Sequence, residues 1–163
     1  MTNEKLTKLA DEVYKALKQT GKTLSTAESC TGGMIGQYLT AVPGISEYYG
    51  YGFITYSNQA KITLLGVNGE TLKNYGAVSS ETVCEMAEGA LKVSGADIAV
   101  SVSGIAGPGG GTKEKPVGLV YVGCAKKGGN TFFEKLNLTG DRQSVREQTV
   151  CRVFEIVLKN INM

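Results

Sequence analysis

The sequence predicts a three-layer α/β/α sandwich with a mixed β-sheet, built as a single domain over residues 1–163. Helix-like and strand-like patterns alternate through most of the chain, which is typical of α/β proteins. A late pair of strand-like segments flanks Gly128-Gly129-Asn130, a sequence that favours a hairpin turn and therefore an antiparallel strand pair. The length of 163 residues suits one ordinary domain, and no internal repeat or linker divides it.

Periodicity and turn residues predict the individual elements. Apolar residues recur at helical spacing from Leu6 to Leu17, with Asn3 as a candidate N-cap and Gly21 at the expected helix end. Residues 97–103 are a nearly continuous small and β-branched run, which is typical of a strand buried on both faces. In chain order we expect a helix between Asn3 and Gly21, a strand over 22–28, a helix over 31–39, a strand over 52–56, one or two short helices between 58 and 75, a helix capped by Ser79 or Ser80, strands over 97–103, 117–125 and 132–138, and a final helix over 141–161 capped by Asp141.

The composition favours a globular protein of the cytoplasm. Apolar residues make up 42% of the chain, which is enough for a sizeable core. Lysine and arginine total 17 against 15 acidic residues and form no basic stripe, so nucleic acid is not expected as a partner. The N-terminal segment is too charged for a signal peptide, and no apolar stretch approaches the ~20 residues that span a bilayer. We therefore expect a cytoplasmic protein without a membrane partner.

The chain contains no histidine, and this limits its chemistry. A Ser-His-Asp triad, a Cys-His dyad and every zinc site that needs imidazole are excluded, so a general base must be Lys, Tyr, Asp or Glu. Glu28 and Asp97 are too isolated to suggest a metal site, and neither a metal nor another cofactor is expected. Without a C-x-x-C pair, we expect free thiols, mostly in the core, at Cys30, Cys84, Cys124 and Cys151.

The first segment with potential chemistry is Thr26-Ala27-Glu28-Ser29-Cys30-Thr31-Gly32-Gly33. It ends a predicted strand just before a helix N-terminus, where free backbone N–H groups can stabilise an oxyanion. Ser29 is therefore a candidate nucleophile. The candidate substrate-binding residues beside it are Cys30, Thr31, Gly32 and Gly33, of which the glycines allow close approach to the backbone. The alternative is that Ser29 or Thr31 merely caps the helix.

The second segment, Thr55-Tyr56-Ser57-Asn58-Gln59-Ala60-Lys61, spans a strand end and the first turn of a helix. Tyr56 and Lys61 can thus point toward one cleft. In the absence of histidine, a deprotonated lysine is the leading base for a serine, as in Ser-Lys variants of the triad. Its pKa must then fall by ~3 from ~10.4, which burial and a nearby cation can supply, and Tyr56 can relay the proton. The alternative is an ordinary solvated lysine.

Two further segments are candidates for ligand binding. The glycine-rich stretch from Gly104 to Lys115 follows a buried strand, where open α/β sheets bind ligands, and we take Gly104 and Gly107 as candidate binding residues. It matches neither a Walker A loop nor G-x-G-x-x-G, and a mobile surface loop is the alternative. Arg142, beside Asp141, can reach a phosphate or carboxylate with two N–H groups. An exposed arginine without a partner is the alternative there.

These motifs occur in an order that closely resembles the CinA C-terminal domain family, the nicotinamide-nucleotide amidohydrolases. The resemblance covers nearly the whole chain from about Leu6. It is carried by Thr26–Gly33 together with Thr40-Ala41-Val42-Pro43-Gly44, Thr55–Lys61, Leu65-Gly66-Val67, Tyr75-Gly76-Ala77-Val78-Ser79, Ser103-Gly104-Ile105-Ala106-Gly107-Pro108, Lys115-Pro116-Val117-Gly118 and Gly140-Asp141-Arg142.

The resemblance implies hydrolysis of the carboxamide of nicotinamide mononucleotide to nicotinic acid mononucleotide and ammonia, with a small-molecule nucleotide as substrate. It implies Ser29 as nucleophile, Tyr56 and Lys61 as its helpers, and Arg142 as a further site residue. Many family members carry an additional N-terminal domain, which this sequence lacks, so we expect a stand-alone form. A homo-oligomer is also expected, since dimers are common among soluble proteins.

Two rival interpretations stay open at this point. A non-catalytic module that binds a nucleotide or a partner would need the glycine-rich stretch and Arg142 but no free-base lysine. A cysteine amidase would use Cys30 as nucleophile, because helix N-termini lower the pKa of thiols.

Overall fold

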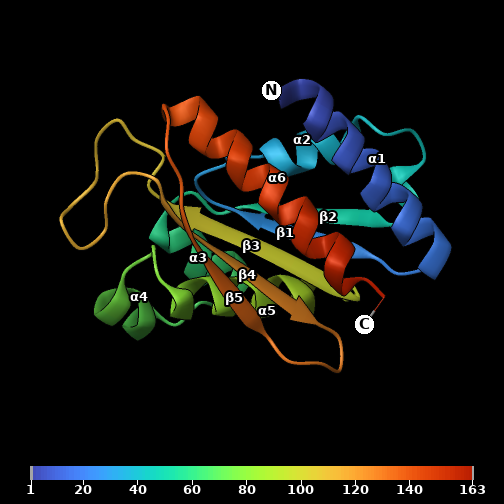
Figure 1. The fold of residues 1–163 in the computed structure, drawn as a ribbon. Coiled ribbons are helices and arrows are strands. Elements are labelled where there is room, and N and C mark those ends of the chain that lie inside the picture. The colour runs from blue at the N-terminus through green and yellow to red at the C-terminus, as the bar shows by residue number, and fades with distance from the viewer. Residues whose placement is uncertain (1, 163) are drawn as a thin grey trace.

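The computed structural model of the chain describes residues 2–162. They form one domain around a five-stranded sheet in the order β2-β1-β3-β4-β5, with helices on both faces (Figure 1). The predicted α/β/α sandwich with a mixed sheet is confirmed. Its elements are α1 (Thr2–Thr20), β1 (Leu24–Glu28), α2 (Met34–Thr40), the 3₁₀ turn η1 (Ile45–Glu47), β2 (Tyr49–Ile54), α3 (Asn58–Leu65), α4 (Gly69–Tyr75), α5 (Ser80–Ser94), β3 (Ile98–Gly104), β4 (Leu119–Lys126), β5 (Phe132–Asn137) and α6 (Arg142–Asn160).

The sheet is parallel on one side and antiparallel on the other. β1 pairs in parallel with both β2 and β3, whereas β4 pairs antiparallel with β3 and with β5. Parallel neighbours need helical crossovers, which α2 provides between β1 and β2 and α3 to α5 provide between β2 and β3. Since β1, β2 and β3 run in one direction, the residues that follow them meet at the same edge of the sheet.

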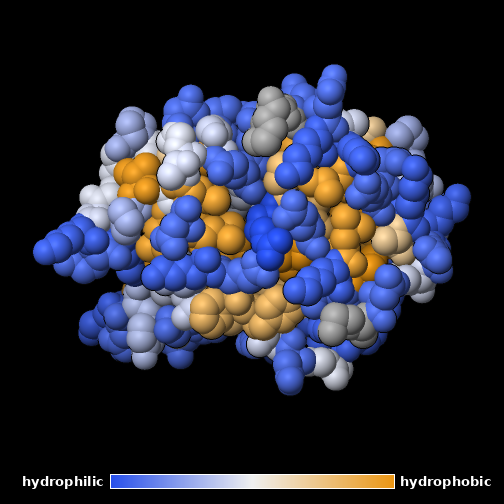
Figure 2. All heavy atoms as spheres, viewed as in Figure 1, coloured by the Kyte–Doolittle hydropathy of each residue, from blue (hydrophilic) through white to orange (hydrophobic). Residues whose placement is uncertain are grey.

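Two apolar cores hold the layers together. The larger one joins α1, α2 and α6 to one face of the sheet and includes Leu17, Ile35 and Phe154. The smaller one joins α5 and the short helices to the other face and includes Val83 and Met86. Figure 2 shows mainly hydrophilic atoms on the outer surface of the layer that contains α1 and α6, with apolar atoms visible between them. Amphipathic helices on a buried sheet produce this arrangement.

Two predicted helix starts are wrong. Asn3 is not a cap, because α1 already includes Thr2, and the Asn3 Oδ1 instead accepts a hydrogen bond from the Tyr38 hydroxyl at 2.6 Å. The second helix begins at Met34 rather than near Thr31. Gly32 and Gly33 have φ values of 57° and 103°, which a right-handed helix does not allow, so residues 29–33 form a separate turn. We call residues 29–33 the Ser29 turn.

Other local predictions are confirmed. Ser79 caps α5 by accepting from the Thr82 N–H, and Asp141 caps α6 by accepting from the Ser144 N–H. All four cysteines are free thiols; three are buried and Cys84 is partly exposed. Among residues 2–162, no helix combines the length and apolar character that a bilayer crossing requires.

Candidate active site

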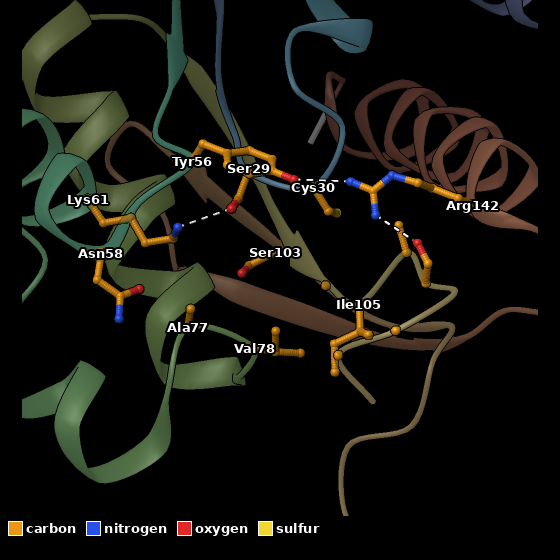
Figure 3. Close-up of a pocket in the computed structure, with 15 residues that line it drawn as sticks. Ser29, Cys30, Tyr56, Asn58, Lys61, Ala77, Val78, Ser103, Ile105 and Arg142 are labelled. Carbon is orange, nitrogen blue, oxygen red and sulfur yellow. Dashed lines mark hydrogen bonds between the residues drawn. The ribbon is translucent and has the colours of Figure 1, made fainter. Parts of the chain in front are cut away.

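A cavity of about 300 Å³ lies at the carboxyl edge of the parallel strands (Figure 3). Ser29 follows β1, Tyr56 lies just after β2, and Ser103 is the last residue but one of β3, so the parallel half of the sheet brings three distant segments to one place. α3 contributes Lys61 from one side and α6 contributes Arg142 from the other. This is the position at which open α/β sheets bind ligands.

Lys61 is buried against Ser29. Its Nζ lies 3.1 Å from the Ser29 Oγ and donates a 2.7 Å hydrogen bond to the Thr55 carbonyl. Ser57 caps α3 and thereby fixes its first turn, which contains Lys61. Lys61 and Leu65, one turn later, are the buried residues of this helix. Only 1% of Lys61 is exposed, so it is not a solvated surface lysine.

The surroundings of Lys61 favour its neutral form. The salt bridges formed by residues 2–162 do not include this lysine, so no carboxylate offsets the loss of water around its ammonium group. Burial therefore lowers the pKa of Lys61 below its ordinary value, although the neighbouring Cys30 opposes this shift. A neutral amine has a lone pair that can accept the Ser29 proton across the existing contact.

Glu28 fills the N-terminus of α2, where the sequence suggested a free site for an oxyanion. One carboxylate oxygen accepts from the Thr31 hydroxyl at 2.6 Å and from the N–H of Gly33 and Ile35, and the other accepts from the Gly36 N–H. The N-cap of α2 is Gly33, so neither Ser29 nor Thr31 caps this helix. The positive end of α2 is thus paired with an internal carboxylate.

Two N–H groups in the Ser29 turn are not used by any other described residue. The Ser29 N–H donates to Val102 and the Gly32 N–H donates to the Ser29 carbonyl. Within the described part of the chain, the N–H groups of Cys30 and Thr31 donate to no other residue. The Cys30 N–H is the candidate oxyanion donor, because Cys30 lines the cavity. Cys30 lines the cavity, whereas Thr31, Gly32 and Gly33 do not, so their expected direct contact with a substrate has no support in the cavity lining.

The Cys30 thiol lies beside Ser29 but is a poor nucleophile at neutral pH. It is 7% exposed, and burial raises the pKa of Cys30 to about 11. Its own backbone N–H, Arg146 and Lys61 oppose this rise without overcoming it. The thiol is therefore protonated near pH 7, which disfavours the interpretation that Cys30 attacks the substrate.

Arg142 joins Tyr56 to the glycine-rich loop. One guanidinium nitrogen donates to the Gly107 carbonyl at 2.8 Å and another donates to the Tyr56 hydroxyl at 3.1 Å (Figure 3). Arg142 is thus not an arginine without a partner. The Tyr56 hydroxyl bonds to Arg142, whereas the Lys61 Nζ contacts the Ser29 Oγ directly. Proton transfer from Ser29 to Lys61 therefore needs no relay through Tyr56. Gly104 and Gly107 both line the cavity, as does the loop up to Gly110.

Sequence reasoning missed several residues of the site. Ser103 and Asn58 line the cavity beside Ser29 and Lys61 (Figure 3). Their positions could have indicated a role in the site, because Ser103 lies near the end of a buried strand and Asn58 is the first residue of α3. Arg146, one helical turn after Arg142, donates to the carbonyls of Cys30 and Thr31 at 3.1 Å and 2.8 Å. Its spacing of four residues from Arg142 was a signal that both could serve one site.

Fold and site together define a single-domain α/β protein with a small-molecule cavity whose polar groups include serine, lysine and arginine. The chain belongs to the CinA family, since the sequence model of the CinA C-terminal domain matches residues 6–161.

Relatives of two different lengths contain a region similar to this chain. A protein from Clostridium acetobutylicum that bears a competence-damage inducible name is 52% identical over 155 residues, which cover 95% of this chain and 38% of that relative. The chain therefore spans little more than a third of that protein. A relative from Enterobacter agglomerans named nicotinamide-nucleotide amidohydrolase PncC is 48% identical over 159 residues, which cover 98% of this chain and 97% of that relative.

Solved structures show the same fold. The crystal structure of the competence/damage inducible protein CihA from Agrobacterium tumefaciens has a TM-score of 0.94 and 42% identity to this chain, and the match covers 98% of this chain and 96% of that one.

Proposed function

We propose that this chain hydrolyses the carboxamide of nicotinamide mononucleotide, yielding nicotinic acid mononucleotide and ammonia. The observation that carries the proposal is the buried Lys61 Nζ, 3.1 Å from the Ser29 Oγ within a cavity. A relative of nearly the same length bears the amidohydrolase name, which supports the substrate class.

In the proposed mechanism, neutral Lys61 accepts the Ser29 proton while the Ser29 oxygen attacks the amide carbon. The N–H group of Cys30, which lines the cavity, stabilises the negative oxygen of the tetrahedral intermediate. The Lys61 ammonium then returns its proton to the departing nitrogen, ammonia leaves, and an ester between Ser29 and the nicotinoyl group remains. Lys61 next removes a proton from water, which attacks the ester carbon. The bond to the Ser29 oxygen then breaks, the acid is released, and the Lys61 ammonium gives its proton to the Ser29 oxygen, so that both residues are restored.

Arg142 is proposed to hold the substrate phosphate. Its guanidinium lies on the cavity wall opposite Lys61, and its bonds to Gly107 and Tyr56 fix its orientation. An oriented guanidinium suits two parallel hydrogen bonds to a phosphate. Tyr56 is proposed to act by orienting Arg142, and the loop from Gly104 to Gly110 is proposed to enclose the nucleotide.

A non-catalytic nucleotide-binding module is the second candidate, because longer relatives bear competence-damage names. The decisive experiment incubates purified protein with nicotinamide mononucleotide and measures ammonia and nicotinic acid mononucleotide. Equal amounts of both products, absent with Ser29→Ala, are expected. Tight binding without either product would support the binding module instead.

We further propose a cytoplasmic enzyme that acts as a homo-oligomer and does not bind nucleic acid. The cytoplasmic location and the absence of nucleic-acid binding rest on the composition and charge of the sequence, and the homo-oligomer rests on how common dimers are among soluble proteins. Size-exclusion chromatography with light scattering measures the mass of the protein in solution and thereby tests whether it is a homo-oligomer.

A further inference from the structure

Arg146 donates an unusual set of hydrogen bonds to backbone carbonyls of the Ser29 turn, residues 29–33. Its Nε donates to the Cys30 carbonyl and its Nη2 donates to the Thr31 carbonyl, while Nη1 donates to the Gln143 side chain. The salt bridges among residues 2–162 do not include Arg146. A half-buried guanidinium is therefore used on two adjacent backbone carbonyls rather than on a carboxylate.

These bonds determine how the turn presents its N–H groups. In a trans peptide unit the carbonyl and the following N–H point in opposite directions, so holding the Cys30 carbonyl directs the Thr31 N–H away from Arg146. Holding the Thr31 carbonyl fixes the next peptide, whose Gly32 N–H donates to the Ser29 carbonyl at 3.0 Å. The Ser29 N–H is bound to Val102 of β3. Ser29 is thus fixed on one side by the sheet and on the other by Arg146.

We infer that Arg146 is a positioning residue for the reaction, which holds Ser29 against Lys61 and, through the Gly32 bond to the Ser29 carbonyl, orients the Cys30 N–H of the same peptide unit without touching the substrate. Arg146 does not line the cavity, in contrast to Arg142 on the same helix. The two arginines therefore have separable roles. Arg142 lines the cavity, whereas Arg146 binds the Cys30 and Thr31 carbonyls outside the cavity lining.

The same helix supplies a matched control. Arg152 is also half-buried and also uses three guanidinium nitrogens, but it pairs with the carboxylates of Glu134 and Glu155. Removing the Arg152 guanidinium costs a comparable set of hydrogen bonds away from the cavity.

The experiment compares Arg146→Met, Arg146→Lys and Arg152→Met in ammonia release from nicotinamide mononucleotide, so it rests on the proposed function. With Arg146→Met we expect kcat to fall by about 10²-fold, the size of effect that a small misplacement of reacting groups produces. KM should stay within about twofold, since ground-state binding is unchanged. Arg146→Lys should recover part of kcat, because an ammonium still donates to a carbonyl but lacks the planar fork. Arg152→Met should keep the wild-type kcat.

Hydrogen exchange provides a readout that does not depend on activity. The peptide that covers residues 29–39 should exchange faster in Arg146→Met than in wild type or Arg152→Met. Unchanged kcat in Arg146→Met, or a rise in KM alone, would overturn the inference. If wild-type protein releases no ammonia, the proposed function fails, and the exchange rate alone decides whether Arg146 holds the turn: equal rates in Arg146→Met and Arg152→Met would overturn it.

Discussion

The Lys61 Nζ lies 3.1 Å from the Ser29 Oγ, although the two residues are 32 positions apart in the chain and Lys61 is almost completely buried. The contact joins the end of β1 to the first turn of α3. A buried lysine without a carboxylate partner is unfavourable as an ammonium ion, and this contact therefore supports the proposal that Lys61 is the base for Ser29.

Lys61→Met should lower kcat by about 10²- to 10⁴-fold, the usual contribution of a general base, with a much smaller change in substrate affinity. Steady-state kinetics and direct binding measurements separate the two effects. Lys22→Met is the matched control, because the Lys22 Nζ bonds to the Ile161 carbonyl rather than to any group of the cavity. Near-normal turnover in Lys61→Met would remove this lysine from the mechanism.

The kcat/KM of the wild type should rise with pH as Lys61 loses its proton. Because burial lowers the pKa of Lys61, this rise should be centred below the ordinary lysine value near 10.5. A pH–rate profile measures it, and a rise centred at or above the ordinary value would contradict the assignment of Lys61 as a neutral base.

Unfolding measurements test the same pKa independently of activity. The unfolded chain binds a proton at Lys61 up to about pH 10.4, whereas the folded chain releases it at lower pH. The stability of the wild type relative to Lys61→Met should therefore be lowest below the folded pKa and should increase with pH between the two values. A difference that is independent of pH would contradict this.

Ser29→Ala should lose essentially all ammonia release while remaining folded, and Cys30→Ala should retain most of it. Burial raises the pKa of Cys30 to about 11, so the thiol is protonated at neutral pH and should also resist mild alkylation. Product formation and mass spectrometry of Cys30 provide the two readouts. An active Ser29→Ala with an inactive Cys30→Ala would make the protein a cysteine amidase.

Arg142→Ala should mainly raise KM for nicotinamide mononucleotide, because its guanidinium is proposed to hold the phosphate. Nicotinamide riboside, which lacks the phosphate, is the control substrate, and the mutation should affect it much less. Tyr56→Phe should act in the same direction by a smaller factor, since it removes one of the two bonds that orient Arg142. Equal loss with both substrates would reject the phosphate assignment.

Gly89→Ala should destabilise the protein by about 1–3 kcal/mol, the usual cost of overpacking. A Cβ at Gly89 would overlap the Leu65 carbonyl at the end of α3, the helix that carries Lys61. Denaturant unfolding measures the change, with Gly50→Ala as a control because a Cβ there meets no atom within 4 Å. Stability equal to that of the Gly50→Ala variant would show that α3 and α5 pack less closely than described.

The sequence by itself determined the order of elements and the type of chemistry. Periodicity and β-branched runs depend on neighbouring residues, so the central strand β3 and the caps Ser79 and Asp141 were predictable. The absence of histidine, a property of composition, directed attention to Lys61 as base. Boundaries set by glycine conformation were less accessible, and the start of α2 was therefore misplaced by the turn at Gly32 and Gly33.

Only the tertiary structure decided how the site is built. The partners of Arg146 lie 116 and 115 residues away in the chain, and Lys61 is buried in a helix, α3, that packs against the distant helix α5. Glu28 occupies the N-terminus of α2 because the turn at residues 29–33 brings the Gly33 and Ile35 N–H groups to its carboxylate. Local sequence patterns encode conformational preference and the inward face of each element. They do not encode which distant donor meets which carbonyl, because that pairing arises only when the packed elements bring the two groups into contact.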